Sequence, residues 1–87
     1  MSKIEKEIKI MSPQGLHARP AAMFVQIASK YDSSIVVTKG SESVNGKSIM
    51  GILMLGAQQH SQVKVTVEGE DAEKAINELE QFLSQSE

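Results

Sequence analysis

Two segments of this sequence alternate apolar and polar side chains, and a period of two is typical of β-strands that bury one face. Residues 3–11 place three isoleucines on one face and charged residues on the other, and residues 63–68 alternate three valines with polar residues. The β-branched run at residues 35–39 predicts another strand, which a Gly-Ser turn joins to a weaker one around residues 42–44. These patterns together predict a four-stranded sheet with one apolar face, which other elements must bury.

Two helices are predicted between these strands. Residues 18–30 have apolar side chains at helical spacing, and Pro20 falls in the first turn, where its missing N–H does no harm. Residues 49–55 lie between Ser48, a favourable N-cap, and Gly56, which can end a helix in the left-handed conformation. The apolar stripe expected on the first of these helices comprises Ala21, Phe24, Val25 and Ala28, widened by Met23 and Ile27.

A third helix is predicted at the C-terminal end of the sequence. Glu70, Asp71 and Glu73 are expected in its first turn, where negative charge suits the helix dipole. If this helix lies on the sheet, removal of the Leu79 or Phe82 side chain should cost about 2 to 5 kcal/mol. Its inward positions are expected to be Ala72, Ala75, Ile76, Leu79, Phe82 and Leu83.

The predicted order of elements is β-α-β-β-α-β-α. Three helices on one face of a four-stranded antiparallel sheet would bury every apolar stripe, which makes a two-layer, open-faced α+β sandwich the simplest architecture. The other face of the sheet would then be wet. A chain of 87 residues is too short for a second core, so residues 1–87 are expected to form one domain.

Composition excludes several functions. Nine basic and 11 acidic residues give a formal net charge of −2, which disfavours binding to nucleic acid or to anionic lipid. The absence of cysteine excludes disulfides and thiolate chemistry, and no residues have recognisable metal-ligand spacing. His60 is expected in an exposed polar loop. No apolar run is long enough to span a membrane and no signal peptide is evident, so we expect a cytoplasmic protein without membrane insertion.

The strongest candidate site is His17, at the junction of a Gly-containing loop and a helix N-terminus. The amides of Ala18 and Arg19 would lack intrahelical acceptors there and could bind a phosphoryl group on the His17 ring, aided by the helix dipole and the Arg19 guanidinium. A neutral imidazole is a nucleophile near pH 7, and a phosphorylated one is a good leaving group. The competing interpretation is that His17 only caps the helix or fills a turn, that Arg19 is a solvated charge and that Pro20 is an ordinary first-turn residue.

A second candidate is the apolar segment that follows Ser48. A short helix can bury only one side, so part of the set Ile49, Met50, Leu53 and Met54 is expected to stay near solvent as a docking surface. The competing interpretation is a fully buried helix. Ser48 is most simply an N-cap worth about 1 kcal/mol, and it is also a candidate site of regulatory phosphorylation.

Two motifs resemble those of the HPr family, the histidine-containing phosphocarriers of the bacterial phosphoenolpyruvate:sugar phosphotransferase system. Residues 15–21 look like its active-site motif and residues 45–51 like its regulatory-serine motif. The resemblance implies that Nδ1 of His17 accepts a phosphoryl group from phosphorylated enzyme I and passes it to IIA components of sugar permeases. Arg19 and the Ala18 and Arg19 amides would hold the phosphate.

The same resemblance implies regulation, partners and a docking surface. Ser48 would be modified by HPr kinase/phosphorylase, and the phosphoserine form would slow transfer and engage a transcriptional regulator. The chain would be a substrate of other phosphotransferases rather than an enzyme, and would need no cofactor. Its partners would dock on Leu16, Pro20, Ile49, Met50, Leu53 and Met54.

Two positions depart from the family pattern. Gly46 stands where relatives often carry Leu, which would trim the apolar patch, and His60 stands where they often have Gly, which is strained if the turn needs a positive φ. His17 argues against the regulatory paralogue that carries glutamine there. A binding module controlled through Ser48, a nitrogen-system phosphocarrier and, more remotely, a small-molecule-binding α+β domain stay open.

Overall fold

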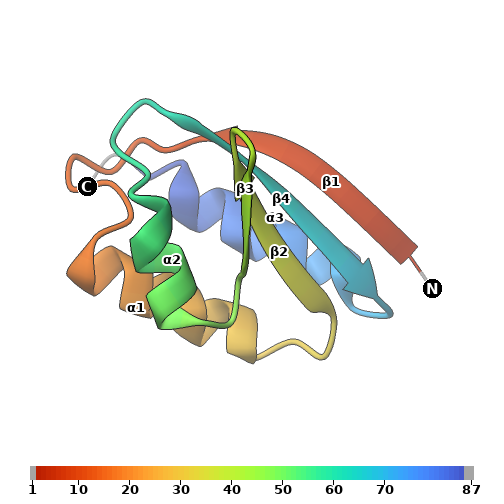
Figure 1. The fold of residues 1–87 in the computed structure, drawn as a ribbon. Helices are drawn as coiled ribbons and strands as arrows, with labels where there is room; N and C mark the ends of the chain where they lie inside the picture. Colours follow the sequence, from red (N-terminus) through yellow and green to blue (C-terminus); the bar gives the residue numbers. More distant parts are fainter. Residues whose placement is uncertain (1, 86–87) are drawn as a thin grey trace.

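Four antiparallel strands form one sheet in the order β1-β4-β2-β3, and the helices lie on one side of it in this computed structural model (Figure 1). The structure describes residues 2–85. The predicted order of elements and the open-faced, two-layer α+β architecture are confirmed. The elements are β1 (Ser2–Lys9), α1 (Ala18–Ser29), β2 (Ser34–Lys39), β3 (Glu42–Asn45), α2 (Ile49–Leu55), β4 (Gln62–Gly69) and α3 (Ala72–Leu83).

The apolar core lies between the sheet and the helices, on the face that the alternation predicts. Ile8 of β1 lies opposite Val63 of β4, and Val37 of β2 lies opposite Val65, with all four side chains buried. Phe24 of α1 is buried in the same core. The intervening residues of β1 and β4 are charged or polar and exposed or half-buried, so the second face of the sheet is wet, as expected.

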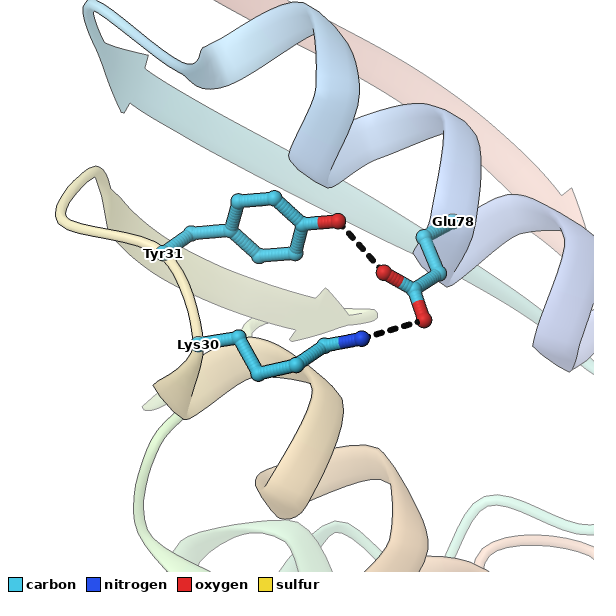
Figure 2. Close-up of polar contacts among 3 residues, drawn as sticks. All are labelled: Lys30, Tyr31 and Glu78. Carbon is cyan, nitrogen blue, oxygen red and sulfur yellow. Dashed lines mark hydrogen bonds and ion pairs between the residues drawn. The ribbon is translucent and has the colours of Figure 1, made fainter.

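Polar side chains tie the helical layer together. Lys30 and Tyr31, at the end of α1, both reach Glu78 of α3 (Figure 2), with Lys30 Nζ 2.8 Å from Glu78 Oε2 and the Tyr31 hydroxyl donating to Oε1. The Lys30 ammonium and the Tyr31 hydroxyl hold the pKa of Glu78 below its usual range, and the Glu78 bond raises the pKa of Tyr31. Lys6 lies on the same face of β1 as Ile4 and Ile8, but its side chain is exposed. Lys6 Nζ forms an ion pair with Glu80 Oε1 of α3 at 2.7 Å.

The expected places of Glu70 and Asp71 in the first turn of α3 are wrong, because both residues precede the helix. α3 begins at Ala72, only Glu73 is acidic in its first turn, and the Asp71 side chain makes no capping hydrogen bond. Its carboxylate crosses instead to the loop between α1 and β2, where it accepts hydrogen bonds from Asp32 N–H at 2.9 Å, from Ser33 N–H at 3.0 Å and from the Ser33 hydroxyl. These donors, the Ser33 hydroxyl foremost, lower the pKa of Asp71 below its ordinary 3.8.

Asp71→Asn is therefore expected to destabilise the fold at neutral pH and to matter less in acid. A carboxyl whose pKa is lower in the folded state than in the unfolded chain contributes stability above its unfolded pKa, and this contribution is lost as the pH falls through the folded value. Denaturant unfolding from neutral pH downward should show the gap between wild type and variant closing. Asp32→Asn, which keeps the backbone donor, is the matched control. A gap that is independent of pH would contradict this role of Asp71.

The turn before β4 contains a non-glycine residue with a positive φ. His60 has a φ of 74°, and its N–H donates to the Ile10 carbonyl oxygen at 2.6 Å. The Ile10 N–H in turn donates to the Ser61 carbonyl oxygen at 2.9 Å. The expected strain at His60 is confirmed, because the turn needs the left-handed conformation and the side chain there is not glycine.

His60→Gly is expected to stabilise the protein by about 0.5 to 1 kcal/mol, because the relief of left-handed strain exceeds the extra entropy of glycine in the unfolded chain. The free energy of unfolding from urea titration is the measurement. A fall in stability would mean that the His60 side chain makes a favourable contribution larger than the strain.

Candidate functional site

The loop before α1 is fixed by the segment that follows α2. Gly15 has a φ of 65°, in the left-handed region, and a Cβ there would lie 2.6 Å from the Ala57 carbonyl oxygen. Leu16 donates its N–H to that same oxygen at 2.8 Å, and its side chain is 1% exposed. Glycine is thus required for the close approach, and the buried Leu16 anchors the start of α1.

His17 occupies the N-cap position of α1, and its side chain is exposed. Its backbone is extended, with φ −106° and ψ 173°, and its carbonyl oxygen accepts from Ala21 N–H at 2.9 Å. Among residues 2–85, however, its ring caps no backbone N–H of the helix. His17 is therefore the N-cap residue, as the competing interpretation expects, but its imidazole makes no capping hydrogen bond and stands exposed at the helix N-terminus.

The start of α1 supplies hydrogen-bond donors next to this ring. Ala18 and Arg19 are the first two residues of the helix, where backbone N–H groups have no intrahelical acceptor. Both residues are exposed, whereas Pro20 is half-buried and carries no N–H. The helix dipole adds about half a positive charge at the same end. A negatively charged group on the ring would therefore lie at the positive end of the dipole, next to two amides without intrahelical acceptors.

A hollow of about 410 Å³ lies beside Arg19, between the loop and the end of α3. His17 is not part of its lining, so the hollow does not enclose the exposed ring. No local sequence pattern predicts it, because its walls come from two segments far apart in the chain. The lining residues are Ser12, Pro13, Gln14, Arg19, Pro20, Met23, Phe82 and Gln85.

Four side chains of α2 form an apolar surface, called here the α2 patch, which comprises Ile49, Met50, Leu53 and Met54. Met50 and Met54 are 63% and 74% exposed, and the other two are more covered. Ile52 and Leu55 face the core and are buried. The interpretation of α2 as a fully buried helix is therefore wrong, and an exposed apolar surface is present where the sequence predicts one.

Two expectations about surface and core are wrong. Leu16 was expected on the docking surface, but its side chain is buried because the loop turns inward to reach Ala57. Met23 was expected to widen the inward stripe of α1, but it is 44% exposed. At 100° per residue, Met23 lies about 200° around the helix from Ala21, so it faces away from the core. Pro20, by contrast, keeps a half-exposed side chain.

Ser48 caps α2, as predicted. Its half-buried side chain accepts a hydrogen bond from Gly51 N–H at 3.1 Å, and Gly56 ends the helix with a φ of 61°. The neighbouring Lys47 is committed to another segment, with its ammonium donating to the Tyr31 carbonyl oxygen at 2.7 Å. The Ser48 hydroxyl therefore lies at the N-terminal edge of the α2 patch.

Gly46 does not trim the α2 patch. It is buried, its N–H donates to the Ile35 carbonyl oxygen at 2.7 Å, and a Cβ at this position would collide with the Ile35 side chain. A Cβ at residue 46 would point into the interior against Ile35, so its absence does not remove apolar surface from the α2 patch.

The described part of the chain contains no group of three His, Cys, Asp or Glu residues placed to hold a metal ion. None of the helices within residues 2–85 combines the length and the apolar character that a membrane crossing requires.

The structure thus combines an open-faced sandwich with an exposed histidine at a helix N-terminus. A family model described as "PTS HPr component phosphorylation site" matches residues 4–85. The chain belongs to the HPr family, the phosphocarrier proteins of the phosphotransferase system, which are carriers and not catalytic enzymes.

Individual relatives are similar over almost the whole chain. The phosphocarrier protein HPr of Buchnera aphidicola is 42% identical over 83 residues, which cover 95% of this chain and 98% of the relative. The crystal structure of HPr from Bacillus anthracis has a TM-score of 0.93 at 38% identity and covers 97% of this chain and 100% of its own. HPr-C-His from Thermoanaerobacter tengcongensis has a TM-score of 0.86 at 49% identity, with coverages of 99% and 94%.

Proposed function

We propose that this chain, as a single HPr-like domain in the cytoplasm, accepts a phosphoryl group on His17 from phosphorylated enzyme I and donates it to IIA components of sugar permeases. The observation that carries the proposal is the exposed, uncapped His17 ring at the N-terminus of α1. A carrier must present its phosphoryl group to two different proteins in turn, and a side chain enclosed in a cleft could not do so.

The chemistry follows from the neutral imidazole. Its unprotonated nitrogen, Nδ1 by family resemblance, attacks phosphorus, and the phosphorus–nitrogen bond forms as the bond to the donor breaks. The Ala18 and Arg19 amides and the Arg19 guanidinium would bind the oxygens of the transferred group. Because phosphoimidazole is a good leaving group, the step runs again toward an acceptor on the next protein.

The α2 patch supplies the surface on which these partners would dock. The patch lies close to the loop that precedes His17, because the Leu16 N–H in this loop donates a hydrogen bond to the carbonyl oxygen of Ala57, just after α2. Exposed methionines suit a surface that several partners share, since their flexible side chains adapt to different shapes. Pro20 and the four patch residues are therefore proposed as docking residues, without Leu16.

Incubation of the chain with enzyme I and labelled phosphoenolpyruvate tests the proposal. A carrier should acquire a label that is labile in acid and stable in base, that maps to the peptide containing His17 and that chases onto an added IIA protein. A label on another residue, or none while a known HPr is labelled in the same mixture, would overturn it.

We also propose that HPr kinase/phosphorylase modifies Ser48 and that the modified form engages a transcriptional regulator. The Ser48 hydroxyl lies at the N-terminus of α2, where a phosphate suits the helix dipole. The same phosphate would add negative charge at the edge of the α2 patch and would oppose docking of an apolar or acidic partner. Modification of Ser48 would in this way reduce docking without changing the His17 ring.

Ser48→Asp is expected to raise the KM of enzyme I for the chain by about tenfold, which corresponds to 1.4 kcal/mol. Ser48→Ala, the control without added charge, should keep the wild-type KM and lose about 1 kcal/mol of stability with the cap. Steady-state transfer from enzyme I measures the first effect and thermal unfolding the second. Equal KM values for the two variants would argue against this regulatory role.

A purely regulatory module and a nitrogen-system carrier are the competing assignments. His17 favours a carrier over the regulatory paralogue, because that paralogue carries glutamine at this position. Deletion of the gene separates the remaining two, since a sugar-system carrier is needed for growth on transported sugars and a nitrogen-system carrier is not.

A further inference from the structure

Two of the four methionines within residues 2–85 lie on the α2 patch. The sequence has five methionines and no cysteine. Met50 and Met54 are one helical turn apart on α2 and are 63% and 74% exposed, whereas Met23 is 44% exposed and Met11 is half-buried. The two most exposed methionines of the described residues therefore lie side by side on the surface proposed for docking.

An exposed thioether reacts with peroxides in a two-electron step. The sulfur lone pair attacks one peroxide oxygen, a sulfur–oxygen bond forms and the oxygen–oxygen bond breaks. Sulfur is oxidised by two electrons, and hydrogen peroxide is reduced to water. Methionine sulfoxide reductases reverse the change with two thiols, which leave as a disulfide together with water.

We propose that Met50 and Met54 are a reversible oxidation site for peroxide-class oxidants, and that their sulfoxides weaken docking on the α2 patch. The site itself follows from exposure alone, whereas its effect on docking rests on the proposed carrier function. A sulfoxide places a polar oxygen where a partner would bury a thioether, and a polar group buried without a donor opposes association.

The fold should tolerate the modification. Packing of α2 rests on Ile52 and Leu55, which face the core, and the helix is capped by Ser48 and Gly56, none of which the oxidation changes. His17 lies outside the patch and keeps its ring. Oxidation is therefore expected to change recognition while leaving the fold and the phosphoryl-accepting group intact.

Peptide mass mapping after graded hydrogen peroxide tests the site. Met50 and Met54 should gain oxygen first, then Met23 and last Met11, with circular dichroism unchanged. Faster oxidation of Met11 or Met23 than of both α2 methionines would overturn the assignment, whatever the outcome for the carrier function.

Transfer kinetics test the consequence, with each variant compared with its own untreated sample. Oxidation of the wild-type chain should raise the KM of enzyme I for the chain by about fivefold or more, with kcat less affected. Treatment with the reductase should return the KM to its starting value. Met50→Leu/Met54→Leu should lose this sensitivity, and the control Met11→Leu should keep it. An unchanged KM with both sites mapped as oxidised, or equal sensitivity of the double variant, would overturn the docking effect. If untreated protein accepts no phosphate, the carrier function fails, and the peptide map still decides the oxidation site.

Discussion

A chain carrying His17→Ala is expected to accept no phosphoryl group from enzyme I, even after long incubation with excess phosphoenolpyruvate. No other group at the start of α1 can replace the imidazole as nucleophile, because Ala18 lacks a functional group and a guanidinium carries N–H donors but no lone pair that could attack phosphorus. Removal of the nucleophile abolishes the step, whereas loss of a binding donor would only slow it. Gel-resolved labelling measures the result.

The fold should be unaffected by this change, which makes the result interpretable. The His17 ring caps no backbone N–H among residues 2–85, and the backbone bond from Ala21 to the residue 17 carbonyl does not depend on the side chain. His60→Gly removes the other histidine of the chain and should leave labelling intact. Labelling that persists in His17→Ala but disappears in His60→Gly would transfer the carrier role to His60.

The secondary structure could be predicted well because local rules agreed with the tertiary fold. α2 has the predicted bounds, since Ser48 and Gly56 mark its ends by their own chemistry. The strand at residues 3–11 ends at Lys9 instead, because Ile10 pairs with the turn at His60 and Ser61 and not with a strand. Such pairing depends on a segment far along the chain, and no local pattern contains it.

The site could be predicted where the signal was local. The position of His17 at a helix start follows from its neighbours, and the exposed α2 patch follows from an apolar run on a short helix. The burial of Leu16 depends on Ala57, and the link from Asp71 to Ser33 joins two loops distant in sequence. The exposure of Met23, in contrast, could have been predicted from its angle around α1.

Leu79→Ala is expected to destabilise the protein by about 2 to 5 kcal/mol, because the Leu79 side chain is 0% exposed and its removal leaves a cavity between α3 and the sheet. A domain of this size is stable by only about 5 to 15 kcal/mol, so the loss is a large fraction of the total. The midpoint of thermal unfolding should fall by roughly 10 °C or more. Guanidinium titration gives the free energy.

Phe82→Ala provides the comparison on the same helix, and here the structure changes the expectation. The Phe82 ring is half-buried and lines the hollow beside Arg19, so its removal takes less apolar surface out of the core and should cost only about 1 to 2 kcal/mol. The two variants should therefore differ, because the Leu79 side chain is fully buried in the core and the Phe82 ring lies at its edge and lines the hollow. Equal losses would mean that the Phe82 ring packs in the core, and the hollow beside the candidate site would then be filled.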